Sequence, residues 1–241
     1  MTAKTLLFYW SCGYYLALFN PFKAKREHKR NKMLDYKSKL CALRDACPEI
    51  QIKKIRILQG GWNLCFLING KYMFKIRKKS DISDINRAKT EKRITDAFRN
   101  IVPFKIPNID IVYAKQYVFL RYEYIDGINL TSLPPETIMT HRFKWAKQIA
   151  NFIFLMHHND PDCLSDLKTP KGDGWGHNDI CNNMIVDPKT MDIIGLIDWE
   201  YAGWDLLSTE FKNCTAYSPK LQQADFDSLL HFEYVKMKNK N

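Results

Sequence analysis

Two aspartates and an asparagine flank a predicted β-hairpin in the last third of the sequence. Two apolar runs, residues 184–186 and 193–197, are separated by an Asp-Pro turn signal. Asp179 and Asn183 precede the first run, and Asp198 follows the second. Because a hairpin returns its second end beside its first, we expect these three side chains to lie together.

Two carboxylates beside an amide suit the transfer of a phosphoryl group. One carboxylate can orient an attacking hydroxyl and accept its proton, while an Asp and an Asn hold the Mg²⁺ that neutralises the phosphates. Asp and Asn are also common at hairpin ends for purely structural reasons. The ordered set, with a lysine-bearing strand upstream, favours the chemical interpretation.

The segment resembles the catalytic region of the aminoglycoside phosphotransferase and choline kinase superfamily. Those proteins carry His-x-Asp-x-x-x-x-Asn, then a strand and a turn, then Ile-Asp-Trp-Glu. The matching residues here are His177-Asn178-Asp179 and Ile197-Asp198-Trp199-Glu200. The resemblance covers roughly residues 50–210, and it implies that Asp179 is the catalytic base and Asp198 a Mg²⁺ ligand.

The asparagine of the motif is out of register with the family. The family spacing places it five residues after the catalytic aspartate, where this sequence has Met184. Methionine is not a hard oxygen ligand for Mg²⁺. The residues after Asn183 fit the strand and turn that follow the family's asparagine, so Asn183 is the expected second ligand in a loop one residue short. Asn182 is the less favoured substitute.

Residues upstream resemble the nucleotide-binding part of the same family. Gly60 and Gly61 lie where the family has a phosphate-covering turn, and Lys75 follows as the nucleotide lysine. Glu91, on the next predicted helix, is the implied partner that orients Lys75 toward the phosphates. Residues 123–125 resemble the connector between two lobes, whose backbone would contact adenine. The implied nucleotide-binding positions are therefore Gly60, Gly61, Lys75, Glu91, Glu123 and Ile125.

Local patterns predict the elements that would position these residues. Asn69-Gly70 between two apolar runs is a strong hairpin signal. After Pro134-Pro135, apolar residues recur at spacings of three and four, as expected for a helix with a buried face. Its expected buried stripe is Phe143, Ala146, Ile149, Ala150, Ile153, Phe154 and Met156, and His157 and His158 are expected to close it. The remaining predictions are helices over residues 34–48 and 87–99 and strands within residues 51–76, 109–113 and 117–122.

Together these elements predict an α+β, protein-kinase-like fold of two lobes. The small N-lobe is β-rich, and the C-lobe is mainly helical with the catalytic hairpin. The expected division is an N-terminal segment over residues 1–32, an N-lobe over residues 33–124 and a C-lobe over residues 125–241. Only 43 residues follow Asp198, with one helix predicted over residues 221–234. We therefore expect the acceptor pocket to be reduced, absent or supplied by a partner.

Composition is consistent with a folded enzyme. The chain has 241 residues, of which 46% are hydrophobic, which suffices for a core and excludes general disorder. Seven cysteines without a C-x-x-C pair predict neither a metal nor a disulfide framework, and so a reducing compartment such as the cytoplasm.

The N-terminal segment has two alternative interpretations. Residues 6–19 are mostly apolar, too few for a membrane span of roughly 20 residues, and no cleavage site for a signal peptide follows. The net charge is +11, and a basic run over residues 23–32 contributes to it. Residues 4–32 either contact a membrane surface weakly or form a flexible basic segment, and translation starting at Met33 would leave the rest intact. No specific binding to nucleic acid is expected.

The sequence thus predicts an ATP- and Mg²⁺-dependent phosphotransferase. The expected acceptor is a hydroxyl of a small molecule such as choline, ethanolamine or an aminoglycoside. The alternative is a catalytically impaired pseudokinase that binds a nucleotide or a protein partner, because the shortened loop could displace the metal ligand.

Overall fold

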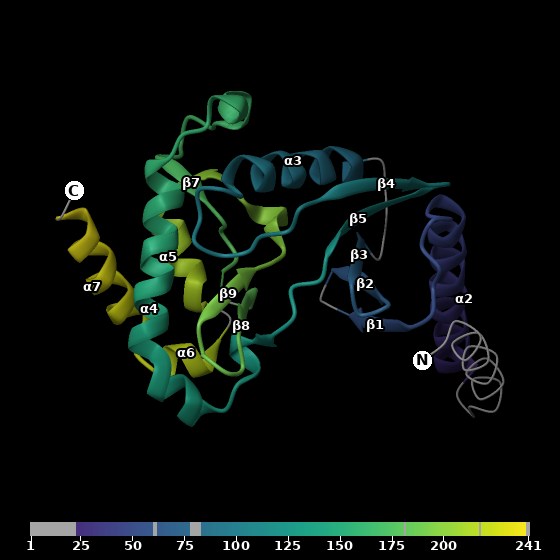
Figure 1. Cartoon of the computed structure of the whole chain (residues 1–241), viewed down its shortest axis with the longest axis horizontal. Coiled ribbons are helices and arrows are strands. Elements are labelled where there is room, and N and C mark those ends of the chain that lie inside the picture. The colour runs from purple at the N-terminus through teal and green to yellow at the C-terminus, as the bar shows by residue number, and fades with distance from the viewer. Residues whose placement is uncertain (1–22, 60–61, 78–82, 181, 217, 240–241) are drawn as a thin grey trace. The chain divides into compact units, whose positions relative to one another are not determined.

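The computed structural model describes residues 23–59, 62–77, 83–180, 182–216 and 218–239 (Figure 1). These residues form two compact units. The first unit contains the described residues up to Ala88 together with Asp110–Tyr124, and the second contains Lys89–Ile109 and the residues from Ile125 onward. Lys89–Ile109 therefore groups with the second unit, whereas the division made from sequence placed it in the first.

The first unit is built on a five-stranded antiparallel sheet with the order β1-β2-β3-β5-β4. The predicted Asn69-Gly70 turn joins β2 to β3. Asn69 has φ 56° and Gly70 has φ 72°, the left-handed pair that a tight hairpin turn requires. The strands are β1 Ile55–Gln59, β2 Asn63–Ile68, β3 Tyr72–Arg77, β4 Asp110–Ala114 and β5 Tyr117–Glu123.

Helix α2 (Lys23–Ala46) packs against this sheet. Leu40 and Leu43 are buried in one cluster with Phe66 and Phe74 of the sheet. The helix starts 11 residues before the predicted segment of residues 34–48, because its basic first half has no apolar periodicity to indicate a helix.

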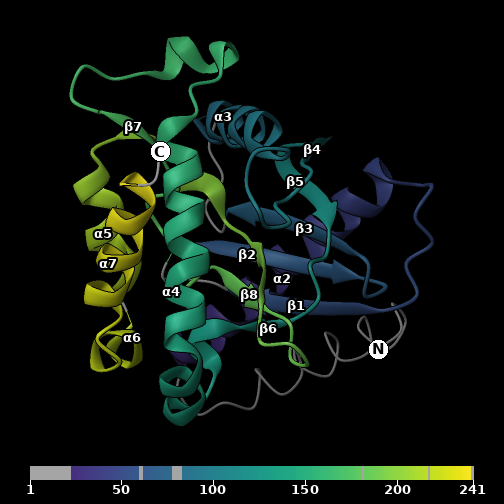
Figure 2. The same ribbon diagram turned by 60° about the vertical axis from the view of Figure 1, so that its left-hand side comes forward.

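The second unit is mainly helical around one apolar core. Helix α4 packs against α7, and α7 in turn contacts α5 (Figures 1 and 2). The predicted buried stripe of α4 is correct except at two positions. Phe154 is only partly buried, and Phe143 is 60% exposed, with the guanidinium of Arg142 4.9 Å from its ring centre. The helices are α3 Ser83–Phe98 (which begins in the first unit), α4 Pro135–His158, α5 Leu207–Thr215, α6 Pro219–Gln223 and α7 Phe226–Lys238.

The prediction of one helix after Asp198 is wrong, since the described residues form three α-helices there. Residues 221–234 are divided between α6 and α7, and Asp225 at the junction has a left-handed backbone with φ 52°. Helix α5 precedes them. Its sequence is largely polar, which is why periodicity gave no signal for it.

The second unit also contains two small sheets, and one of them includes the predicted catalytic hairpin. Strands β6 (Ile128–Asn129), β8 (Met184–Val186) and β9 (Ile193–Leu196) form an antiparallel sheet in which β8 and β9 are the predicted hairpin. Strand β7 (Gly174–Gly176) pairs with β10 (Gly203–Asp205). Three short 3₁₀ helices complete the unit: Leu130–Ser132, Asp162–Leu167 and Trp199–Tyr201.

The described residues contain no helix that is long and apolar enough to cross a membrane. The apolar run of residues 6–19, on which the predicted membrane contact depends, lies outside the described residues.

Candidate active site

The hairpin brings Asn183 and Asp198 to the same end of its small sheet. Strands β8 and β9 pair Met184 with Leu196, and the carbonyl of Asn183 accepts the N–H of Ile197 at 3.0 Å. Asp198 is the next residue. The prediction that these residues lie together is therefore met in the second unit of the structure.

Asn183 also fixes the carboxylate of Asp179. Its Nδ2 donates to the carbonyl of Asp179 at 2.7 Å and to the Asp179 Oδ2 at 3.0 Å. Met184, which stands at the family spacing, is 1% exposed and packs in the core. Asn182 is exposed, and its carbonyl accepts the side-chain amide of Asn129. Of the three candidates, Asn183 is therefore the side chain that lies against Asp179.

Asp179 lies in an environment that favours its protonated form. Burial of the half-buried side chain, followed by the negative charge of Asp198, raises the pKa of Asp179 to about 6. The hydrogen bond from Asn183 opposes this shift, and the charge of Glu200 adds to it. The result is a carboxyl group whose pKa is close to neutral pH, as suits a group that exchanges a proton.

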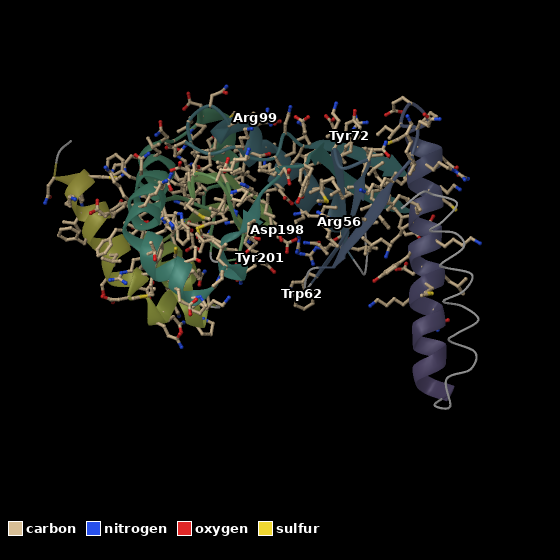
Figure 3. The ribbon with its side chains drawn as sticks, turned by 60° about the horizontal axis from the view of Figure 1, so that its bottom comes forward. Arg56, Trp62, Tyr72, Arg99, Asp198 and Tyr201 are labelled. Carbon is tan, nitrogen blue, oxygen red and sulfur yellow. The ribbon has the colours of Figure 1, made fainter. Side chains whose placement is uncertain are left out.

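Asp198 has a backbone conformation that is rare for aspartate. With φ 61° and ψ 66° it is left-handed, at the step from β9 into the 3₁₀ helix Trp199–Tyr201. Strained residues of this kind persist where the surroundings hold them, often at functional sites. Tyr201, at the end of the same 3₁₀ helix, is 48% exposed. The side chains of Asp198 and Tyr201 are labelled in Figure 3.

His177 is a buried structural link between the two ends of this segment. Its Nδ1 accepts the N–H of Asp179 at 3.2 Å, so the hydrogen lies on Nε2, which donates to the carbonyl of Ile197 at 3.1 Å. The ring also packs edge-on against Trp199, with ring centres 4.9 Å apart. His177 therefore ties the backbone before Asp198 to the backbone of Asp179.

Glu210 of α5 lies against the loop that carries Asp179 (the Asp179 loop), and sequence reasoning did not identify it. It is 3% exposed, and its Oε2 accepts the N–H of Asn178 at 2.5 Å. A Cβ on Gly176 would come within 2.9 Å of that oxygen, so the carboxylate needs glycine at this position. Burial raises the pKa of Glu210 to about 7, although its hydrogen bonds from the backbones of Asn178 and His177 oppose the shift. A lone glutamate in a short polar segment gives no sequence signal of such a role.

Replacing Glu210 with glutamine should change how stability depends on pH. The folded protein holds this proton more tightly than the unfolded chain, whose glutamate has a pKa of 4.5. The free energy of unfolding therefore falls as pH rises from about 4.5 to 7 and stays reduced above that. Glu210→Gln removes this loss, so its stability relative to wild type should increase by about 2 kcal/mol between pH 5 and pH 8.

Urea denaturation at both pH values measures this difference. Glu136→Gln, at an exposed position in the first turn of α4, is the matched control and should show no comparable change. Parallel stability curves for Glu210→Gln and wild type would contradict the assigned environment of Glu210.

No protein-family model matches the sequence, and no match was found among curated proteins. Solved structures do match the fold. The GDP and kanamycin complex of APH(2″)-IIia has a TM-score of 0.66 at 15% identity, over 81% of this chain and 82% of that chain. ADP-bound aminoglycoside phosphotransferase APH(2″)-Ib has 0.64 at 17%, over 80% and 81%. A macrolide 2′-phosphotransferase of type I has 0.58 at 13%, over 82% and 81%.

The chain has the fold of the aminoglycoside phosphotransferases. Its antiparallel sheet with a mainly helical C-terminal region is the predicted protein-kinase-like architecture, and that prediction is confirmed.

The predicted nucleotide-binding residues of this phosphotransferase fold are spread over both units. Lys75 lies mid-sheet in β3, between Cys65 of β2 and Leu120 of β5, and is 5% exposed. Glu123 ends β5 and is exposed. Gly60 and Gly61 lie outside the described residues.

Glu91 and Ile125 belong to the second unit. Glu91 is 3% exposed in α3, and Ile125 lies beside Gly195 of β9. Lys75 belongs to the first unit and Glu91 to the second. Their pairing would be a contact between the two units, and it stays a prediction.

The donor atoms beside Asp179 are suited to Mg²⁺. The amide nitrogen of Asn183 donates both of its hydrogen bonds to Asp179. The Oδ1 of Asn183 is therefore the atom of this side chain that can bind a metal. With the carboxylate of Asp198 this makes two hard oxygen donors. The described residues contain no group of three or more His, Cys, Asp and Glu side chains able to hold a metal. Two protein ligands suit a Mg²⁺ ion that is held mainly by substrate phosphates and water.

Proposed function

We propose that this protein is a small-molecule kinase that transfers the γ-phosphoryl group of a nucleoside triphosphate to a hydroxyl. The observation that carries the proposal is the arrangement around Asp179. Its carboxyl has a raised pKa, receives a hydrogen bond from Asn183 and lies near the charge of Asp198. The likeness to solved aminoglycoside and macrolide phosphotransferases, over about 80% of the chain, supports the same reaction class.

In the proposed reaction, Asp179 orients the acceptor hydroxyl and takes its proton. The hydroxyl oxygen forms a bond to the γ-phosphorus, and the bond from that phosphorus to the β,γ-bridging oxygen breaks. The nucleoside diphosphate leaves with the electron pair of the broken bond. Asn183 keeps the Asp179 carboxylate in place through the hydrogen bond to Oδ2.

Asn183 and Asp198 are the proposed ligands of Mg²⁺, which would neutralise charge on the phosphates. Lys75 is the proposed phosphate-binding cation, with Glu91 as its partner. Glu123 and Ile125 flank the proposed adenine-binding backbone. Neighbouring structures contain GDP, ADP or ATP, so the donor is proposed as ATP, with GTP to be tested beside it.

The charges near Asp179 favour a cationic acceptor. Glu200 acts on Asp179 as a negative charge and is not a proposed metal ligand, so an acceptor with an ammonium group would be attracted to it. Choline, ethanolamine and aminoglycosides all have this chemistry. The neighbours that were solved with kanamycin, streptomycin or gentamicin make aminoglycosides the first class to test.

Nucleotide binding followed by an acceptor screen tests the proposal. Mg·ATP or Mg·GTP should raise the melting temperature of the protein, and one cationic acceptor should support release of the nucleoside diphosphate. The panel contains kanamycin, choline, ethanolamine, a macrolide and, as the uncharged control, glycerol. No thermal shift with either nucleotide would contradict the proposal, and binding without transfer to any acceptor would favour the pseudokinase.

A further inference from the structure

Asn178, immediately before Asp179, is held in a strained backbone conformation. Its φ of 62° is left-handed, a region that residues other than glycine rarely adopt. Three hydrogen bonds surround it. The N–H donates to Glu210 Oε2 at 2.5 Å, the carbonyl accepts Asn213 Nδ2 at 3.0 Å, and its own Nδ2 donates to the carbonyl of Tyr201 at 3.2 Å. Both sides of this residue's backbone are therefore bound to α5.

Helix α5 is a fixed support for these contacts. At its start, the N–H of Leu207 donates to Asp173 Oδ1 at 2.9 Å, and His157 at the end of α4 makes a hydrogen bond to the same oxygen. Phe211 packs against Tyr234 of α7 with ring centres 5.2 Å apart. Glu210 and Asn213 are three residues apart and so share one face of the helix. That face is the one that contacts the Asp179 loop.

Burial of the Glu210 carboxyl is energetically unfavourable, because it removes the carboxyl from water. Within the described residues it makes no ion pair, and the charges that act on it, those of Asp179 and Asp205, are both negative. Its Oε1 has no hydrogen-bond partner among the described atoms, and neither has the nearby Asn178 Oδ1. The other oxygen, Oε2, accepts the N–H of the strained residue Asn178. The burial of this carboxyl is understandable if its role is to stabilise the left-handed conformation of Asn178.

We infer that Glu210 and Asn213 are positioning residues that hold Asn178 in its left-handed conformation and so aim the carboxylate of Asp179. The effect on catalysis rests on the proposed function, whereas the effect on the loop does not. Because the peptide that links Asn178 to Asp179 is planar, rotation at Asn178 swings the Asp179 backbone as a unit. A displacement of about 1 Å at a reacting group can cost about 100-fold in rate.

Isosteric variants of the two residues test the inference. Asn213→Asp replaces the donor with an acceptor facing the Asn178 carbonyl, and Glu210→Gln keeps an acceptor for the Asn178 N–H while adding a donor. Lys212→Ala, at an exposed position of the same helix, is the control. The readouts are amide hydrogen exchange at Asn178 and Asp179, measured by NMR, and separate values of kcat and nucleotide KM.

The expected result distinguishes positioning from general stability. Asn213→Asp should speed exchange at Asn178 and Asp179 at least about 10-fold, and lower kcat at least about 10-fold with nucleotide KM unchanged. Glu210→Gln should retain both within about threefold, and Lys212→Ala should match wild type. Unchanged exchange in Asn213→Asp would overturn the inference, and faster exchange with a normal kcat would overturn the proposed effect on catalysis.

Failure of the proposed function gives a different pattern. If wild-type protein binds nucleotide but transfers to no acceptor, the exchange rates still decide whether Asn213 holds the loop. Faster exchange confined to Asn178 and Asp179 in Asn213→Asp supports the positioning role. Exchange that rises equally across α5 and the core shows a general loss of stability and overturns it.

Discussion

Replacing Asp179 with asparagine should lower kcat for phosphoryl transfer by about 10³-fold, because proton transfer by a positioned base contributes about 10²- to 10⁴-fold. Asparagine has the same size but cannot accept the hydroxyl proton. Nucleotide binding should persist, since the proposed contacts of the nucleotide are made by other residues. The measurement is steady-state release of the nucleoside diphosphate, with the thermal shift by Mg·ATP as the test of binding.

Asp162→Asn provides the matched control for this variant. Asp162 is an exposed carboxylate in the same unit, at the start of the 3₁₀ helix Asp162–Leu167. Its loss should leave both kcat and the thermal shift unchanged. If Asp179→Asn retained more than about a tenth of wild-type kcat, Asp179 would not be the base, and the site would need another proton acceptor.

Local sequence was sufficient to predict the part of the site that a hairpin assembles. The hairpin brings Asn183 opposite Ile197 and hence beside Asp198, and both strands could be recognised from their apolar runs. The same register indicated Asn183 rather than Met184 as the candidate metal ligand, and Met184 lies in the core. A one-residue difference in the preceding loop is absorbed before β8, because strand pairing with β9 fixes where β8 begins.

The support of the loop could not be predicted in this way. Glu210 and Asn213 reach Asn178 across more than 30 positions of sequence, from a helix with no apolar periodicity. Their role follows from pairing β10 with β7, which returns the chain to the start of the loop just before α5. Neither the pairing of two three-residue strands nor a buried glutamate has a local sequence signature.

The first unit illustrates a third case, in which the element is predictable but its partner is not. The position of Lys75 in a central strand follows from the Asn69-Gly70 hairpin, which sets the register of β2 and β3. Glu91 is buried in α3, as a residue with a specific role would be. Its pairing with Lys75 depends on how two units meet, and no local pattern determines that.

Asp198→Asn should lower kcat by about 10³-fold for a different reason, the loss of a metal ligand. Stabilisation of phosphate charge by Mg²⁺ is worth several kcal/mol, and about 1.4 kcal/mol corresponds to a tenfold change in rate. Unlike Asp179→Asn, this variant should need a higher Mg²⁺ concentration for half-maximal rate, and Mn²⁺, which binds such ligands more tightly, should restore part of the activity. A titration of rate against each metal separates the two variants.

The metal-free protein gives a second test of Asp198 that needs no turnover. Burial and then the charge of Asp198 raise the pKa of Asp179, so Asp198→Asn should lower that pKa toward its ordinary value while the part due to burial remains. Glu200→Gln removes a smaller cause and should lower the pKa of Asp179 less. NMR titration of the Asp179 carboxyl carbon measures both. An unchanged pKa in Asp198→Asn would show that the two carboxylates are not close enough to share a metal and a reacting phosphate, and the proposed division of roles between them would fail.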